Sequence, residues 1–210
     1  MILSHEHKFL FLKTRKTAGS SLEKCLLPHL NPETDICTGG SYEDDYPSLN
    51  YPSGWNTHLE LSELGVLINS LQFLEILNNY FVFTIERNPW DKVVSMYFWM
   101  QKTRPKVFGD MNFSQFVRFK NVHSIGLDTH IYFYNEYRPN KIYDFANLDP
   151  IRDKLFQKGI DIRESFSKTR LKNNTNQTKQ YSKMYKNEND IFIVHNRFKE
   201  VVDFMGYTYD

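Results

Sequence analysis

The sequence predicts an α/β domain of three layers, in which helices flank a mostly parallel central sheet. Three short apolar runs have the character of buried strands, at Phe9–Leu12, Tyr80–Ile85 and Lys141–Leu148. Stretches with apolar residues at helical spacing separate these runs, so strands and helices alternate along the chain. This alternation is typical of a parallel sheet, because two parallel strands need a crossover connection, usually a helix, between them.

Length and composition point to one globular domain with a local site. The chain has 210 residues, enough to bury a sizeable core, and we expect a single domain over residues 1–210. It is 40% hydrophobic and 24% charged, with a formal net charge of +1. This balance argues against a nucleic-acid binder and a disordered acidic chain. Cys25 and Cys37 are too few to indicate a disulfide framework or a zinc cluster.

The apolar runs of the sequence are too short for a membrane span, which needs about 20 residues. The first residues, MILSHEHKFLFLK, lack the apolar segment of a signal peptide. We therefore expect a cytoplasmic protein without a membrane partner. Glycosylation sequons at Asn112, Asn173 and Asn176 carry no information in that compartment.

The first predicted strand leads into a loop with the character of an anion site. Residues 13–21 follow Phe9–Leu12 and bring three cations and two hydroxyls before a run of small side chains. Ser20 and Glu23 have the spacing of a capping box, which predicts the start of a helix. The free N–H groups and the dipole at a helix N-terminus attract anions, and Gly19 would let an anion approach the backbone closely.

The order of residues in this loop decides the kind of anion site. A Walker A loop carries its lysine after the glycines, as GxxxxGK[ST], whereas here Lys16 precedes Gly19. The order therefore argues against an ordinary ATP-binding loop. For this loop taken alone, a basic turn between a strand and a helix is an alternative.

A second motif follows the predicted strand Tyr80–Ile85. Arg87 stands at the end of the strand, and Asn88 and Pro89 are typical of the cap and first position of a helix. Apolar residues at spacings of three and four then continue the helix. Ser95 lies between those apolar positions, so we expect it on another part of the helix surface.

The remaining segments are predicted from ordinary local signals. Asn31–Gly54 is rich in proline, glycine and small polar residues and is predicted as a long loop. Ser124–Tyr137 is predicted as helical. Asp149–Gly159 should form a helix that opens at Pro150, and an apolar stripe predicts a last helix that ends at Gly206.

Together the two motifs resemble those of sulfotransferases that use 3′-phosphoadenosine 5′-phosphosulfate (PAPS), in particular the carbohydrate branch with its Golgi-type and bacterial members. RKTAGSSL, residues 15–22, is similar to the 5′-phosphosulfate loop of that branch, for example PKTAGTSL. RNPWDKVVSMY, residues 87–97, is similar to its pattern RNPxDRxxSxY, with Lys92 where the family often has arginine. The resemblance runs in order from about Lys8 to the C-terminus and implies a P-loop-like version of the α/β fold.

The resemblance implies a PAPS site built from both motifs. Lys16 would stabilise charge on the leaving phosphate oxygen, and Arg87 and Ser95 would hold the 3′-phosphate. The other contacts to the 5′-phosphosulfate would come from Arg15, Thr17, Ala18, Gly19, Ser20 and Ser21.

A polar and basic stretch near the C-terminus is a further candidate. From its composition alone, Leu171–Lys186 is predicted as a solvated loop. In the family that the chain resembles, a segment of this kind folds over the nucleotide. Lys172 and Lys179 are therefore candidates for contacts near the 3′-phosphate.

His58, between the two motifs, is the candidate general base. Sulfuryl transfer to a hydroxyl needs a group that takes the hydroxyl proton, and histidine titrates near neutral pH. WNTHLELSELG, residues 55–65, resembles a GHxxxxEL segment that the family carries at this place. Glu60 and Glu63 are alternative bases, and a histidine that only precedes the next helix is the third possibility. That helix is predicted from Ser62 to Leu77.

The sequence therefore predicts a sulfotransferase that moves the sulfuryl group of PAPS to an acceptor hydroxyl, expected to belong to a carbohydrate. The reaction would be an in-line displacement governed by positioning and preorganised charge, with no metal required. Two other classes stay open. A kinase or NTPase with a variant P-loop would need Mg²⁺ and prefer ATP, whereas a non-catalytic nucleotide- or glycan-binding module would keep the fold and lose the base.

Overall fold

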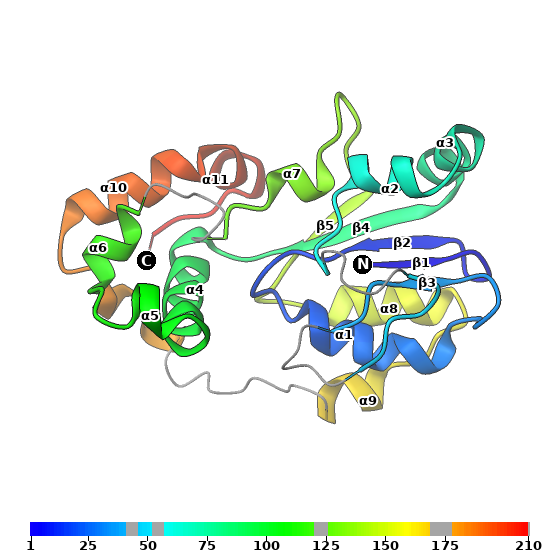
Figure 1. Cartoon of the computed structure of the whole chain (residues 1–210), viewed down its shortest axis with the longest axis horizontal. Helices are drawn as coiled ribbons and strands as arrows, with labels where there is room; N and C mark the ends of the chain where they lie inside the picture. Colours follow the sequence, from blue (N-terminus) through cyan, green and yellow to red (C-terminus); the bar gives the residue numbers. More distant parts are fainter. Residues whose placement is uncertain (41–45, 52–56, 120–125, 169–177, 210) are drawn as a thin grey trace. The chain divides into compact units, whose positions relative to one another are not determined.

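The computed structural model describes residues 1–40, 46–51, 57–119, 126–168 and 178–209 (Figure 1). The chain divides into two compact units. Unit 1 comprises Met1–Glu86 and Thr129–Leu171, and unit 2 comprises Arg87–Asp128 and Lys172–Asp210.

Unit 1 is built on a mixed sheet of five strands in the order β3-β1-β2-β4-β5. The strands are β1 (Ile2–Ser4), β2 (Phe9–Leu12), β3 (Ile36–Cys37), β4 (Phe81–Glu86) and β5 (Lys141–Asp144). β2 pairs parallel with β4 and β4 with β5, whereas β1 pairs antiparallel with β2 and with β3. The predicted α/β class is thus confirmed, but the sheet is mixed, and its parallel part is limited to the three predicted strands.

β1 and β3 are not predicted by the sequence pattern. β1 is joined to β2 through a tight turn in which Lys8 has a left-handed backbone, with φ 48°. β3 lies inside the segment predicted as a long loop, and it is only two residues long. Two residues show no periodicity, and Ile36 becomes a strand residue because it pairs with Leu3 of β1.

The helices of unit 1 pack on both faces of this sheet. They are α1 (Gly19–Leu26), η1 (Leu27–His29), α2 (Leu61–Leu67), α3 (Ser70–Asn79), α7 (Thr129–Tyr132), α8 (Asp149–Gln157) and α9 (Arg163–Lys168). Figure 1 shows α1, α8 and α9 along one face of the sheet, and α2 and α3 on the other side.

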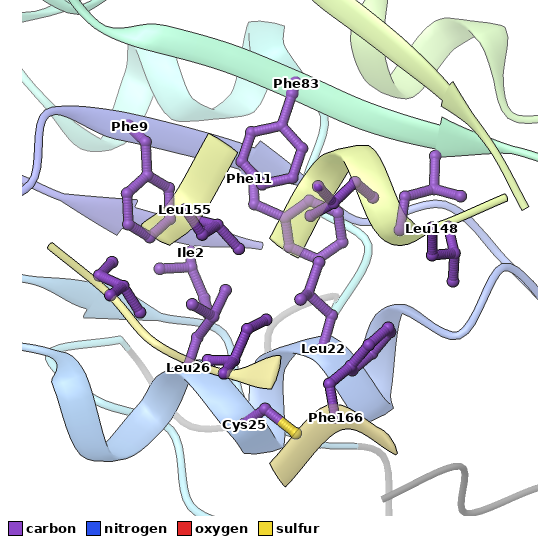
Figure 2. Close-up of a cluster of buried hydrophobic side chains, with 14 of the residues drawn as sticks. Ile2, Phe9, Phe11, Leu22, Cys25, Leu26, Phe83, Leu148, Leu155 and Phe166 are labelled. Carbon is purple, nitrogen blue, oxygen red and sulfur yellow. The ribbon is translucent and has the colours of Figure 1, made fainter. Parts of the chain in front are cut away.

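One hydrophobic core of unit 1 fills the space between the sheet and helices α1, α8 and α9. Figure 2 shows Phe11 and Phe83 of the central strands facing the side chains of these helices. The two rings stack with their centroids 5.1 Å apart. Leu22 and Leu26 pack from α1, so the core holds the start of this helix close to the end of β2.

The single helix predicted from Ser62 to Leu77 is in fact two helices. The chain extends at Ile68, and the side chain of Asn69 accepts a hydrogen bond from the backbone N–H of Gln72, which starts α3 anew. This second cap shifts the helical phase. Leu71 of α3 is 81% exposed as a result.

Two other predictions for unit 1 differ in outcome. The helix predicted at Ser124–Tyr137 is limited to α7 where it is described, because the chain turns at Asn135, which has a φ of 49°. The predicted helix at Asp149–Gly159 is confirmed as α8. Gly159 ends it with a left-handed backbone, φ 85°.

Unit 2 is a packed set of helices. They are α4 (Pro89–Thr103), α5 (Pro105–Phe108), α6 (Phe113–Val117), η3 (Thr178–Met184), α10 (Glu188–Arg197) and α11 (Lys199–Met205). The predicted last helix is broken at Phe198, and Gly206 ends it as expected with a φ of 68°. The prediction of a solvated loop fails at its C-terminal part, because η3 forms there and Tyr185 is buried in the core of the unit. Among the described residues, no helix is long and apolar enough to cross a membrane.

Candidate functional site

The first candidate site is the loop that leads from β2 into α1, here called the β2–α1 junction. Lys16 and Ala18 have positive φ angles of 61° and 62°, whereas Arg15, Thr17 and Gly19 do not have a positive φ. Residues of alternating φ sign can turn successive backbone N–H groups toward one point, an arrangement that binds anions. A left-handed backbone costs a non-glycine residue about 1–2 kcal/mol, and such strain concentrates where ligands are held.

The start of α1 differs from the predicted capping box of Ser20 and Glu23. Ala18 is the N-cap, and among the described residues it makes no side-chain capping bond. Glu23 points instead into the protein, where its carboxylate accepts hydrogen bonds from the Lys13 ammonium at 2.7 Å and from the amino group of Met1. A buried ammonium needs a buried counter-charge, and this requirement outweighs a helix cap.

Gly19 is required by this buried lysine. A Cβ atom at position 19 would lie 2.7 Å from Cγ of Lys13, which is closer than packed atoms approach. The expected role of Gly19 was to let an anion approach the backbone. The structure gives it a packing role, since the stem of Lys13 passes directly over its backbone.

The ionisable groups beneath the junction form one buried cluster. Lys13 Nζ donates to the Tyr46 hydroxyl at 3.1 Å, and that hydroxyl donates to Glu23. Burial by itself would raise the pKa of Glu23, but the ammonium groups of Met1 and Lys13 outweigh it and hold this pKa below its ordinary value. Burial and the Glu23 carboxylate raise the pKa of Tyr46, so the phenol stays protonated.

The hydroxyl groups of the loop divide into two kinds. Thr17 is fully buried, and its Oγ1 donates to the carbonyl of Thr14 at 3.1 Å. Thr14 in turn donates to the carbonyl of Ile85, which ties the loop to β4. The hydroxyl of Thr17 is therefore used inside the loop. Ser21 is also buried, whereas Arg15, Lys16 and Ser20 are half-buried side chains of this junction.

His58 lies at the same junction. Its Nδ1 is 3.0 Å from the backbone carbonyl oxygen of Lys13, the first residue after β2. Because a carbonyl only accepts hydrogen bonds, Nδ1 must carry the proton, and in the neutral ring Nε2 then has the lone pair. The structure thus brings the predicted base to the strand end from which the candidate anion loop departs.

The two carboxylates considered as alternative bases take part in capping α2. Glu63 accepts a hydrogen bond from the backbone N–H of Glu60 at 2.8 Å, and the two residues form a capping box. Glu60 also accepts from the Ser62 hydroxyl at 3.1 Å. Because both carboxylates already accept hydrogen bonds at the start of α2, His58 is the better candidate for the base.

The second candidate site is the start of α4 in unit 2, here called the α4 junction. Asn88 is the N-cap as predicted, and its Oδ1 accepts from the backbone N–H of Trp90 at 3.1 Å. The buried side chain of Arg87 contacts Asp91 through Nε, at 2.7 Å from Oδ2. Asp91, in the first turn of α4, thus orients the guanidinium of Arg87.

Ser95 and Lys92 of α4 have different surroundings. Ser95 is half-buried and stands one helical turn after Asp91, so Asp91 and Ser95 share a face of the helix. Lys92 is fully buried, and its Nζ lies 2.9 Å from Oδ2 of Asp128. Lys92 is therefore part of a structural ion pair.

Only one of the two candidate lysines of Leu171–Lys186 lies among the described residues. Lys172 lies outside the described residues. Lys179 lies within η3, of which the backbone is described at that position.

No protein-family model matches the chain, and no curated protein or solved structure matches it significantly. Function is therefore inferred from the residues and geometry of the two junctions. Within the part of the chain that the structure describes, no cluster of three or more His, Cys, Asp and Glu side chains could hold a metal ion.

Sequence reasoning missed the residues that support the two junctions. Glu23 and Tyr46 lie 10 and 33 positions from Lys13, and such distances follow no local pattern. Asp128 lies 36 positions after Lys92. The contact between Arg87 and Asp91 could have been predicted, because a spacing of four residues in a helix is a recognised signal for an ion pair.

Proposed function

We propose that this protein is a PAPS-dependent sulfotransferase that transfers the sulfuryl group to a hydroxyl of a carbohydrate. The observation that carries the proposal is the β2–α1 junction. Its alternating φ signs at the N-terminus of α1 favour an anion there, Lys16 adds a cation, and His58 adds a proton acceptor beside the same strand end.

In this proposal the backbone N–H groups of the junction and Lys16 bind the 5′-phosphosulfate. The acceptor oxygen forms a bond to sulfur while the bond from sulfur to the phosphate oxygen breaks. Nε2 of His58 takes the proton of the acceptor hydroxyl, and Lys16 stabilises the negative charge that develops on the phosphate oxygen. The products are the sulfated acceptor and adenosine 3′,5′-bisphosphate.

The α4 junction supplies nucleotide selectivity in the same proposal. Arg87 and Ser95 bind the 3′-phosphate, which ATP and AMP lack. The ion pair with Asp91 supports this role, because it holds the buried guanidinium in one orientation before the nucleotide arrives. A preoriented arginine loses less conformational entropy on binding a phosphate than a mobile one.

The test compares adenosine 3′,5′-bisphosphate with AMP by isothermal titration calorimetry. The bisphosphate should bind more tightly, since a hydrogen bond to a charged group contributes about 1.5–3 kcal/mol, or roughly a factor of 10 to 150. Arg87→Ala should remove most of that difference. Arg104→Ala is the matched control, because this exposed arginine follows the same helix and should leave both affinities unchanged.

Arg87 is buried, so Arg87→Ala can also weaken the fold. Ser95→Ala avoids this problem, because it removes one half-buried hydroxyl and keeps the helix. It should weaken the bisphosphate and leave AMP binding unchanged. Equal affinities for the two nucleotides in the unaltered protein, or tighter binding of ATP with Mg²⁺, would overturn the proposal in favour of a P-loop kinase or NTPase.

A further inference from the structure

An apolar groove on unit 2 is not used by the proposed nucleotide contacts. Its volume is about 440 Å³, within the range of small-ligand sites. It is formed by α10, by the first turn of α4 and by the segment that follows α11. The lining side chains that carry the inference are Trp90, Glu188, Phe192, His195, Tyr207 and Tyr209.

The floor of the groove is held by several contacts. Trp90 is only 2% exposed, and its Nε1 donates to the carbonyl of Ile191 at 3.1 Å. Its ring stacks against His195 at 6.2 Å and meets Tyr209 edge-on at 5.7 Å. The segment after α11 is also held, because Asn88 donates to the carbonyl of Thr208 at 2.9 Å. A ligand would therefore find the floor already ordered, which lowers the entropy cost of binding.

One wall of the groove is a large apolar side chain that faces solvent. Phe192 of α10 is 61% exposed. An exposed aromatic ring next to a preformed groove offers a face on which a ligand can pack, and exposed apolar surface of this kind marks binding sites. The next helix, α11, also carries an exposed phenylalanine. This residue, Phe204, is 58% exposed and does not line the groove.

The charge of the groove limits its occupant. Among the lining residues that the structure describes, Glu188 is acidic, and neither lysine nor arginine is present. A carboxylate without a cation repels phosphate and sulfate groups, so the groove does not suit the anionic part of a nucleotide. The aromatic faces carry partial negative charge and attract the weakly positive C–H groups of a ring. Glu188, His195 and Thr208 offer hydrogen-bond partners for hydroxyl groups.

We propose that this groove binds an uncharged pyranose ring, with its C–H face on the aromatic wall and its hydroxyls toward the polar rim. This inference deepens the proposed function and rests on it only in taking the bound sugar as the acceptor. The binding itself requires no nucleotide.

The experiment is a titration of the full chain followed by saturation-transfer and ¹⁵N-correlation NMR without nucleotide. The probes are methyl β-D-glucopyranoside, methyl β-D-galactopyranoside and methyl 2-acetamido-2-deoxy-β-D-glucopyranoside, with adenosine as the aromatic alternative. At least one pyranoside should bind with a Kd of about 1–10 mM, a typical strength for a shallow single-sugar site. The amide signals that shift should include those of Phe192, His195 and Thr208.

Phe192→Ala should weaken this binding at least about fivefold, which is the loss of roughly one aromatic contact. Phe204→Ala is the matched control, since it removes an equally exposed phenylalanine of the same unit and should leave the sugar affinity unchanged. Glu188→Gln should weaken pyranoside binding, because the amide accepts hydrogen bonds less strongly than the carboxylate.

Three outcomes would overturn the inference. They are the absence of binding by any pyranoside up to about 50 mM, equal losses in Phe192→Ala and Phe204→Ala, and binding of adenosine in place of the sugars, which would make the groove a nucleobase site. Because the titration contains no nucleotide, its result is independent of the comparison between adenosine 3′,5′-bisphosphate and AMP. Either proposal can fail while the other holds.

Discussion

The β2–α1 junction and the α4 junction are both places where a strand leads into a helix, yet they offer a ligand different groups. At the first, the proposed donors are backbone N–H groups, because Lys16 and Ala18 have a left-handed backbone and the following side chains are small. At the second, Asn88 already caps the helix, and the proposed donor is the side chain of Arg87, which Asp91 orients. Backbone donors suit an anion at short range, whereas a fixed guanidinium suits a phosphate of defined position.

Each junction also carries a lysine that is committed to a buried carboxylate. Lys13 shares Glu23 with the amino group of Met1 and with Tyr46, and it lies in unit 1. Lys92 pairs with Asp128 in unit 2, and both side chains are 0% exposed. A basic residue near a candidate phosphate site therefore does not indicate ligand binding until its burial is known. A buried lysine needs a carboxylate partner inside the protein, and that ion pair stabilises the fold.

The largest expected effect separates chemistry at the first junction from recognition at the second. His58→Ala should lower kcat about a hundredfold to ten-thousandfold, the usual contribution of a general base, with nucleotide affinity nearly unchanged. The measurement is transfer from ³⁵S-labelled PAPS to a carbohydrate acceptor. Lys16→Ala should lower both turnover and affinity, since in the proposed mechanism this residue contacts the nucleotide itself.

The control for this experiment is His29→Ala, which removes a half-buried histidine of η1 outside both junctions and should keep full activity. Near-normal turnover of His58→Ala across pH 6–8 would assign the base to another residue, and Glu60 and Glu63 would be replaced next. Joint loss of stability and nucleotide binding would show that His58 only supports the start of α2.

The second prediction compares the two buried ion pairs. Asp128→Asn should lower the free energy of unfolding by about 3–5 kcal/mol, because it leaves Lys92 buried without its counter-charge. Glu23→Gln should cost more, since two ammonium groups lose one carboxylate. Urea denaturation followed by circular dichroism measures both. Glu164→Gln, in an exposed pair with Lys168, should have no measurable effect. A smaller loss for Glu23→Gln than for Asp128→Asn would reverse this ranking.

Glu23 also predicts a dependence of stability on pH. Its pKa in the folded protein is below that of an unfolded glutamate, which is about 4.3. Its contribution to stability is therefore complete above that unfolded value and is lost as the pH falls through the folded pKa. The unfolding free energy should fall less steeply on acidification in Glu23→Gln than in the unaltered protein. Parallel curves would mean that Glu23 does not supply this dependence.

The smallest of these effects concerns the glycine at the first junction. Gly19→Ala should destabilise the protein by about 1–3 kcal/mol, because the new methyl group meets the buried stem of Lys13 at 2.7 Å. Gly65→Ala is the matched control in α2, where a Cβ atom would find Phe73 at an ordinary distance of 3.5 Å. Alanine has the higher helix propensity, so this control should be neutral or stabilising. Thermal unfolding of both variants distinguishes them, and equal melting temperatures would show that Lys13 moves aside.

The sequence by itself determined the features that arise within a few residues. The three parallel strands follow from apolar runs, the start of α4 from the Asn88 cap, and the end of α11 from Gly206, because strand character, caps and left-handed glycines depend on local sterics and hydrogen bonds. The candidate residues Lys16 and Arg87 were found in the same way, from their place at the ends of predicted strands.

Only the tertiary structure decided the features that join distant parts of each unit. β3 forms because it can pair with the edge of β1. Glu23 does not cap α1 as expected, because it is the buried counter-charge of Lys13. The anchoring of His58 to the carbonyl of Lys13 spans 45 positions in the chain. Such contacts depend on which distant groups are buried together, and a local sequence pattern does not predict this.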